Sequence, residues 1–311
     1  DPRTGDRVPG FTANSFTWAQ PLPGTSSFVI FGTFQKTAQL LESVIGLDGR
    51  AWQVSPRYIL PVLTRAEQRG QLTFGYDFKQ TNNDLAFGGT FISNQFVQIH
   101  QFLIDFTVSR TWRGGVIASA STLVLSPGGL SKANSDEAFQ PAPGRGGTPF
   151  ARASYAYFRS VLTQTTPLGA TGAEAVTRLT GQLTSGNLLP SEQLPGAGPG
   201  FVRAYYANEV LGSQGMLATQ EIWSPPFPLL KAMGSRGQFQ AGAYVDAGMV
   251  GNPRRLPNEP TWIRTASLGV MGRYRLGSLV DIGFDYGTQL RQLPGTAERV
   301  NLGFLSVTLG Y

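Results

Sequence analysis

Apolar and polar side chains alternate along much of this chain with a period of two, the pattern that predicts β-strands. Residues 70–81 show it clearly, because large apolar side chains occupy one face and polar or small ones occupy the other. The apolar face is Leu72, Phe74, Tyr76 and Phe78, and the polar face is Gln71, Thr73, Gly75, Asp77 and Lys79. Residues 101–109 and 278–287 repeat the pattern. Each segment is therefore predicted to be a strand with one apolar and one polar surface.

Segments of this kind recur along the chain with Gly, Pro, Asn or Asp between them, as strands joined by turns do. The thirteen predicted strands are residues 11–20, 26–37, 50–60, 69–80, 95–110, 114–125, 150–164, 174–187, 215–223, 237–248, 263–275, 278–287 and 299–311. Thirteen is odd, whereas single-chain bacterial barrels have an even number of strands. We expect residues 1–10 to hold the remnant of another strand, which gives 14, and one hairpin missed by the pattern would give 16.

The kind of side chain on each face separates a membrane barrel from a soluble sandwich, which also alternates. The apolar face is dense in Phe, Leu, Val and Tyr, whereas the polar face holds Gly, Gln, Thr and single charges, as in lipid-facing strands. Lipid contact requires the sheet to close, because an unpaired edge is not tolerated there. We predict an all-β fold, an antiparallel transmembrane β-barrel formed by residues 1–311 as one domain, with a long inward-folded extracellular loop.

The composition agrees with a barrel. The chain has 311 residues with 39 Gly, 21 Pro and 14% charged residues, and its mean hydropathy is -0.09. No run reaches the roughly 18 to 20 apolar residues of a membrane-spanning helix, which excludes a helical membrane protein. The long segments after the strands ending near residues 125, 187 and 248 are expected at the extracellular rim, and the short turns at Pro21–Gly24 and Trp112–Gly115 at the other rim.

The last predicted strand ends the chain on an aromatic residue. Its apolar face is Gly303, Leu305, Val307, Leu309 and Tyr311. A terminal strand of this kind resembles the signal that outer-membrane barrels present to the barrel assembly machinery. An ordinary edge strand is the alternative, but a flat apolar edge on a soluble protein would invite aggregation. We therefore expect outer-membrane lipid and the assembly machinery among the partners of the chain.

Few residues could support chemistry. The chain has no cysteine, and its single histidine, His100, shares a face with Phe102 and Ile104 near the start of a predicted strand, which suits the membrane interface better than a catalytic base. The residue counts exclude histidine and thiolate metal sites. The net charge of +6 comes from scattered Lys and Arg without a cluster that would track phosphates. We expect no enzyme activity, metal, cofactor or nucleic-acid partner. The carboxylates expected in a wet lumen are Asp77, Asp105, Asp281 and Asp285.

Two stretches carry the candidate functional site. The loop LPGAGPGFVRAYY is rich in Gly and Pro and contains a single Arg203, and the strand GAYVDAG contains Asp246. Strand parity places Asp246 on the polar, lumenal face. A lumenal carboxylate is well matched by a guanidinium, which is planar and stays charged. Arg203 on an inward-folded loop is one candidate partner. The alternative is a solvated Arg203, with Asp246 paired to Arg273 or Arg275 instead.

These stretches resemble conserved motifs of the TpsB transporters of two-partner secretion, which share a superfamily with BamA. In that family a Leu-rich Ser-Glu-Gln segment precedes a Gly pair and a Val-Arg-Gly-Tyr loop, and a later strand carries an aromatic, Asp and Gly at alternate positions. The matching residues here are Ser191, Glu192, Gln193, Ala197, Gly198, Val202, Arg203, Ala204, Tyr205, Gly215 and Glu221 in the first motif, and Tyr244, Asp246 and Gly248 in the second. A weaker third match covers Gly75–Gly89.

The chain departs from the family pattern at two loop positions. Ala204 replaces the Gly after the Arg, and Ala197 replaces the first Gly of the pair. If position 204 requires a positive φ, alanine is strained there. The plug helix and the two POTRA domains that precede the barrel in this family have no counterpart in the 311 residues, so the resemblance is to the barrel portion.

The resemblance implies a protein of the bacterial outer membrane that exports an unfolded partner, a secreted exoprotein, through its lumen. It also implies a contact between Arg203 and Asp246, called the loop lock below, that holds the loop against the inner wall and gates the lumen. No phosphate-cradling Gly-Lys-Ser/Thr motif is present, so export is expected to need no nucleotide. Two alternatives stay open, namely a passive solute channel and an assembly factor that inserts other barrels.

Overall fold

Thirteen antiparallel strands form one continuous sheet in the computed structural model, which describes residues 10–41, 45–87, 90–228, 237–293 and 299–310. The strands of this sheet are β1 (Gly10–Pro21), β2 (Ser27–Leu41), β3 (Ile45–Arg65), β4 (Gln68–Phe87), β5 (Thr90–Trp112), β6 (Gly115–Ser126), β7 (Tyr155–Pro167), β8 (Glu174–Thr184), β11 (Gln214–Trp223), β12 (Gln238–Gly251), β13 (Ile263–Leu276), β14 (Val280–Gln289) and β15 (Asn301–Leu309). They are ordered as in the chain, with β8 next to β11. A separate pair, β9 (Leu194–Pro195) and β10 (Leu211–Gly212), belongs to the loop between β8 and β11.

Each predicted strand corresponds to one strand of the sheet. The largest differences are in β3, β4 and β5, which are 21, 20 and 23 residues long and extend beyond the predicted segments. They exceed the roughly 9 to 11 residues that a tilted strand needs to cross a membrane, so they continue past it. The further strand expected from residues 1–10 falls on residues 1–9, which lie outside the described residues.

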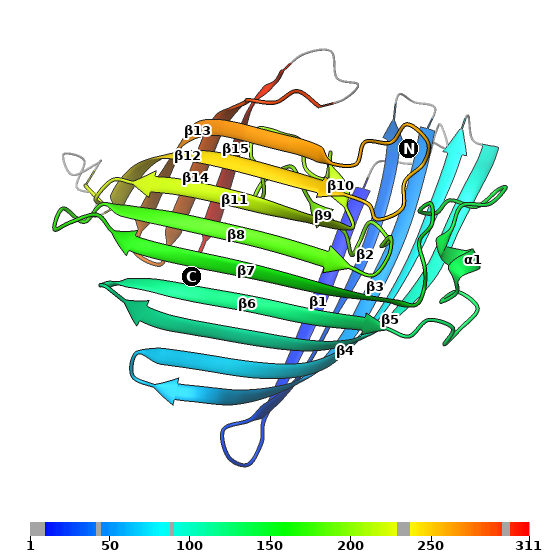
Figure 1. Ribbon diagram of the computed structural model, residues 1–311, viewed down its shortest axis with the longest axis horizontal. Helices are drawn as coiled ribbons and strands as arrows, with labels where there is room; N and C mark the ends of the chain where they lie inside the picture. The colour runs from blue at the N-terminus through cyan, green and yellow to red at the C-terminus, as the bar shows by residue number, and fades with distance from the viewer. Residues whose placement is uncertain (1–9, 42–44, 88–89, 229–236, 294–298, 311) are drawn as a thin grey trace.

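The sheet curls into a barrel-shaped wall on which the strands run obliquely (Figure 1). Large apolar side chains cover its outer face, including Phe16, Trp18, Phe74 and Phe102, of which 44 to 55% stays exposed. Alternate residues face inward and are mostly small or polar. Such an arrangement places the hydrophobic surface where lipid can cover it and the polar surface around a lumen.

The last strand follows the same parity. Gly303, Leu305, Val307 and Leu309 lie on the outer face of β15, and the leucines are among the most exposed apolar side chains of the molecule at 73 and 72%. Tyr311, the final member of the proposed assembly signal, lies outside the described residues. The apolar face of β15 is therefore directed towards lipid.

Three long loops leave the barrel at one rim, and the short turns of the β1–β2, β5–β6 and β13–β14 hairpins lie at the other (Figure 1). Residues 127–154, 185–213 and 252–262 leave the strands β6, β8 and β12 at the first rim, which is the extracellular one in outer-membrane barrels. The first of these loops contains the helix α1 (Asp136–Phe139). Within the described residues, no helix is long and apolar enough to cross a membrane.

A pair of arginine substitutions on β5 tests which face meets lipid. Phe106 points outward, whereas Thr107 lines an open part of the lumen. We expect Phe106→Arg to cost roughly 2 to 4 kcal/mol in the free energy of unfolding from bilayers, and Thr107→Arg to cost about 0 to 1 kcal/mol. Equilibrium urea unfolding in lipid vesicles measures both values, and equal costs would contradict the assigned parity.

Candidate functional site

The segment between β8 and β11, residues 185–213, packs against the inner wall of the barrel. Its two arms pair as β9 and β10, and Gly196 N–H donates to the Val210 carbonyl at 2.8 Å. Buried apolar side chains of the segment, among them Val202, cluster with Leu217 of β11 and Val250 of β12. This apolar contact holds the tip of the loop beside the inward-facing residues of these two strands.

Arg203, at the tip of the loop, binds two carboxylates on that wall. Its Nε and Nη2 donate to the two oxygens of Asp246 at 2.8 Å each, and its backbone N–H donates to Asp246 Oδ2 at 3.0 Å. Its Nη1 lies 2.8 Å from Glu221 Oε1. The side chain of Asp246 has 0% exposure, so the guanidinium is what compensates its buried charge. Burial alone would lower the pKa of Arg203, but hydrogen bonds and charge from Asp246 raise it, and the guanidinium stays charged.

The ring of Tyr244 lies against the guanidinium of Arg203. The centre of its ring lies 3.5 Å from Arg203 Cζ, close enough for a cation–π contact. The ring lies over Gly269 on β13 and Gly287 on β14, and a Cβ at either glycine would collide with it. These three residues are register partners across the strands β12, β13 and β14. The two glycines therefore form a slot without which Tyr244 could not occupy this place.

Gly248 provides the space for the loop itself. A Cβ at this position would lie 2.9 Å from Val202 Cγ2 and 2.7 Å from Leu217 Cδ2, closer than side chains pack. The alternate residues Tyr244, Asp246 and Gly248 of β12 thus contribute an aromatic support, a charge and a gap in the wall. This gives a physical reason for the residue types at these three positions.

The loop tip includes two residues in the left-handed region of backbone conformation. Gly198 has φ of 106° and Ala204 has φ of 65°. The left-handed conformation costs a residue with a Cβ roughly 1 to 2 kcal/mol, so Ala204 is strained in the way expected from its replacement of glycine. Ala197, the other departure, is buried in the apolar cluster of the loop. Both alanines are accommodated with the tip in contact with the wall.

Tyr205 fixes the other side of Ala204. Its ring is fully buried, and its hydroxyl donates to the Arg291 carbonyl at 2.6 Å and accepts from Ala266 N–H at 3.2 Å. Arg203 and Tyr205 therefore attach the tip to β12 and to the region of β13 and β14. The strained residue lies between these two attachments, which together hold its backbone.

The other bases proposed for Asp246 have a different partner. Arg273 Nη2 contacts Asp281, and Arg275 Nε lies 3.3 Å from the same carboxylate. These side chains are 41 and 50% exposed, in contrast to the buried Asp246. The alternative pairing is therefore wrong, and Asp246 is bound by the loop.

A second attachment of the loop involves Glu192, to which the sequence assigned no role beyond the motif. Its side chain is 1% exposed, and its carboxylate accepts from Lys79 Nζ at 2.8 Å, Gln101 Nε2 at 2.7 Å and the Tyr157 hydroxyl at 3.0 Å. Arg159 Nη2 donates to the Glu192 carbonyl at 3.1 Å. Burial alone would raise the pKa of Glu192, but Lys79 and these hydrogen bonds hold it below its usual range. We call this group the Glu192 anchor.

The two attachments reach different parts of the wall. The Glu192 anchor uses β4, β5 and β7, whereas Arg203 binds β11 and β12. From β4 to β12 there are six strand spacings of about 4.8 Å. The loop therefore connects well-separated strands of the wall instead of lying along one of them.

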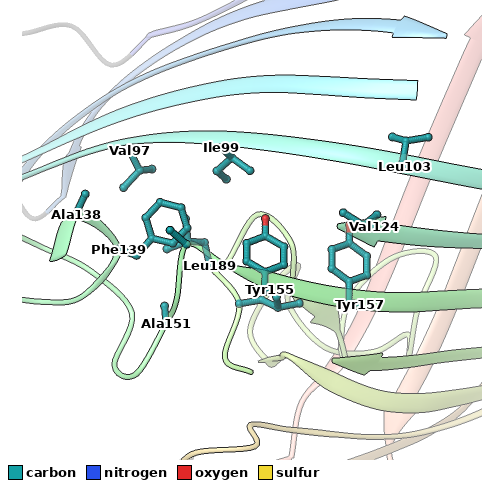
Figure 2. Close-up of a cluster of buried hydrophobic side chains, with 12 residues drawn as sticks. Val97, Ile99, Leu103, Val124, Ala138, Phe139, Ala151, Tyr155, Tyr157 and Leu189 are labelled. Carbon is teal, nitrogen blue, oxygen red and sulfur yellow. The ribbon is translucent and has the colours of Figure 1, made fainter. Parts of the chain in front are cut away.

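Other long loops close over the Glu192 anchor. Phe139 of α1 is fully buried in a cluster with Val97 and Ile99 of β5 and with Leu189, close to Tyr155 (Figure 2). Asn187 joins three loops, because its side chain donates to the carbonyls of Pro149 and Arg254 and accepts from Arg254 N–H. The loop with Arg203 is thus part of a wider cap at the rim of the long loops.

The remaining candidate residues lie on the strands of the wall and not on the loop. His100 lies on the outer face, with its ring centre 4.8 Å from that of Phe78 and its Nδ1 2.5 Å from the Tyr76 hydroxyl. It occupies the middle of β5 and not the start of the strand, because β5 begins at Thr90. Of the predicted lumenal carboxylates, Asp77 pairs with Arg57, and Asp105, Asp281 and Asp285 line the same face. Among the described residues, no group of three or more His, Cys, Asp or Glu is placed to hold a metal ion.

Comparison with known proteins shows the fold. No family model and no curated protein sequence matches the chain. Among solved structures it is similar to CdiB from Acinetobacter baumannii, with a TM-score of 0.68 and 16% identity over 97% of this chain and 51% of that one. CdiB from Escherichia coli has a TM-score of 0.70 and 16% identity over 94% of this chain and 53% of that one. BamA from Haemophilus ducreyi lacking POTRA domains 1–3 has a TM-score of 0.61 and 13% identity over 96% of this chain and 62% of that one. The chain thus has the β-barrel fold seen in CdiB and BamA, and it spans between half and two thirds of the length of these structures.

The slot beneath Tyr244 can be tested with two glycine-to-alanine variants. Gly287→Ala places a methyl group against the Tyr244 hydroxyl, so we expect a loss of about 1 to 3 kcal/mol in the free energy of unfolding. Gly181→Ala on the outer face of β8 is the matched control, because a Cβ there meets nothing within 4 Å. Urea unfolding measures both, and equal stability of the two variants would contradict the slot.

The Glu192 anchor predicts a pH-dependent contribution to stability. Glu192→Gln removes the carboxylate that lies 2.8 Å from Lys79 Nζ and leaves that ammonium with Asp77 at 4.0 Å, and we expect a cost of about 3 kcal/mol at neutral pH. Because the pKa of Glu192 is lowered in the folded state, its stabilisation is fully present above the ordinary carboxyl value of 4.5 and is lost as pH falls through the folded value.

The difference in the free energy of unfolding between wild type and Glu192→Gln should therefore persist at pH 5 and shrink only in stronger acid. Urea unfolding at a series of pH values measures it, with Glu137→Gln on the exposed face of α1 as the control. A difference that already disappears between pH 7 and 5 would contradict the lowered pKa.

Proposed function

We propose that this protein exports a secreted partner protein across the bacterial outer membrane through its barrel, and that the loop lock gates the path. The similarity to CdiB, a two-partner secretion transporter, supports protein export. In this proposal residues 1–311 act as a single barrel domain. The similarity to BamA, a part of the barrel assembly machinery, makes assembly of other barrels the second activity to be tested.

The observation that carries the proposal is the buried, doubly held loop. Arg203 attaches it to β11 and β12, and Glu192 attaches it to β4, β5 and β7. A polypeptide that passes this level of the lumen has to displace the loop. Breaking a buried ion pair by removing one partner costs about 3 to 5 kcal/mol, which is large enough to keep the path closed at rest.

The lumenal wall away from the loop suits an unfolded chain. A hollow of about 750 Å³ lies along β3 to β7 towards the rim of short turns. Small and uncharged side chains predominate in its lining, and among them are Gln71, Thr107, Ser109, Ala120 and Thr163. Such a surface offers hydrogen bonds to any polypeptide backbone without selecting particular side chains, as an export path requires.

Charge exchange across the loop lock tests the gate. Arg203→Asp and Asp246→Arg each place like charges together, so we expect each to reduce export of the partner exoprotein about tenfold or more. The double exchange restores opposite charges and should recover a substantial part of it. Exoprotein released into the medium is measured, and Arg273→Ala, which alters a lumenal ion pair outside the loop, is the control.

Planar-bilayer recordings of the same proteins separate the candidate functions. We expect small or flickering currents from wild type and larger, steadier currents from Arg203→Ala, since its loop is released. Large steady currents from wild type would indicate a passive channel. Normal exoprotein release together with loss of other barrels from the membrane would indicate an assembly factor, and a double exchange that restores nothing would contradict the direct role of the ion pair.

A further inference from the structure

A shallow apolar groove runs across the outer face of the wall whose inner face holds the loop. Its floor is a row of register partners, Ala218 on β11, Ala247 on β12 and Ala266 on β13. Met216 and Met249 form the neighbouring row on the side of the long loops. The hollow measures about 560 Å³, and most of its lining surface is apolar. Small residues between larger ones leave a depression the width of several strands.

The groove ends in a basic hollow at the rim of the long loops. Arg264 is the register partner of Met249, and with Arg291 it lines both the groove and a second hollow of about 610 Å³. Arg299 and Trp262 also line the second hollow. All three arginines are exposed, and none forms an ion pair within the part of the chain that the structure describes. Among the residues that the structure describes, the hollow therefore carries three positive charges without an ion-pair partner.

An apolar groove that leads into exposed guanidinium groups matches the two halves of an anionic lipid. Guanidinium groups bind phosphate through paired, charge-assisted hydrogen bonds. Basic clusters beside a hydrophobic span bind anionic headgroups, and tryptophan is typical of the membrane–water boundary. The position at the extracellular rim places such a headgroup in the outer leaflet.

We propose that this surface, the Arg264–Arg291–Arg299 hollow together with the alanine-floored groove, binds a multiply phosphorylated, acylated lipid of the extracellular leaflet. Its phosphates contact the three arginines, and one acyl chain lies over Ala218, Ala247 and Ala266. Three arginines around one hollow can contact more than one phosphate, which favours such a lipid over a zwitterionic phospholipid.

The site is joined to the loop through Tyr205, whose hydroxyl bonds the backbone of both Arg291 and Ala266. The carbonyl of Arg291 accepts the hydroxyl of Tyr205, which follows Arg203 and Ala204 at the loop tip. A headgroup that holds the side chain of Arg291 therefore acts next to the attachment point of the loop. Lipid binding does not depend on the export function, because it rests on the outer face alone.

Native mass spectrometry of the purified full chain in detergent tests the proposal with bisphosphorylated lipid A as the probe. We expect saturable binding to wild type and at least about tenfold weaker binding to the double variant Arg264→Gln/Arg291→Gln, because two charge-assisted contacts are removed and each contributes about tenfold or more. Ala247→Leu, which fills the groove floor without changing charge, should weaken binding as well. Heat-modifiable migration on gels verifies that each variant is folded.

Arg113→Gln is the matched control, because Arg113 lies beside Trp112 at the opposite rim, with its Cζ 4.7 Å from the indole ring. It should bind lipid A as wild type does. Equal loss in this control would show non-specific attraction to positive charge and overturn the site. Unchanged binding by the folded double variant, or equal binding of monophosphorylated lipid A or phosphatidylethanolamine by wild type, would also overturn it.

Discussion

The guanidinium of Arg203 is the group on which the arrangement of the lumen depends. A buried charge of this kind is stable only when its donors are occupied, and here Asp246, Glu221 and the ring of Tyr244 surround it. Each of these partners in turn requires a particular wall. Tyr244 fits because the neighbouring strands present glycine, and the loop approaches Asp246 because Gly248 leaves room for Val202. The strain at Ala204 is borne by the same set of contacts.

The Glu192 anchor gives the loop a second, chemically different attachment. There the loop contributes a buried carboxylate, which is bound by Lys79, Gln101 and Tyr157 of the wall. At the other end the loop contributes the cation Arg203, and the wall contributes the carboxylates. The same loop is covered by α1 and joined to its neighbours by Asn187. Displacement of the loop from one end leaves it tethered at the other, which suits a gate that opens and closes repeatedly better than a plug that leaves.

The wall of β11 to β13 carries small residues on both faces, and those of each face have a different role. Gly248 and Gly269 admit the loop and Tyr244 on the inside, whereas Ala218, Ala247 and Ala266 form the floor of the lipid groove on the outside. Because side chains alternate across a strand, neighbouring residues of one strand serve two unrelated surfaces. The hydrogen bond from the Tyr205 hydroxyl to the Arg291 carbonyl connects these two surfaces.

The alternation of residues such as Phe74 and Asp77 determined the β-fold, the inner and outer faces and the thirteen strands, because a period of two is a local property of the chain. The family resemblance pointed to Arg203 and Asp246. The sequence pattern did not predict that β3 to β5 continue past the membrane, since the period of two is interrupted in their extensions, as at Asn82, Asn83 and Asp84 of β4. Nor could it reveal the partners of Glu192, which lie 35 to 113 residues away along the chain. Those contacts, the slot beneath Tyr244 and the grouping of Arg264, Arg291 and Arg299 depend on strand register and loop folding, which only the tertiary structure decides.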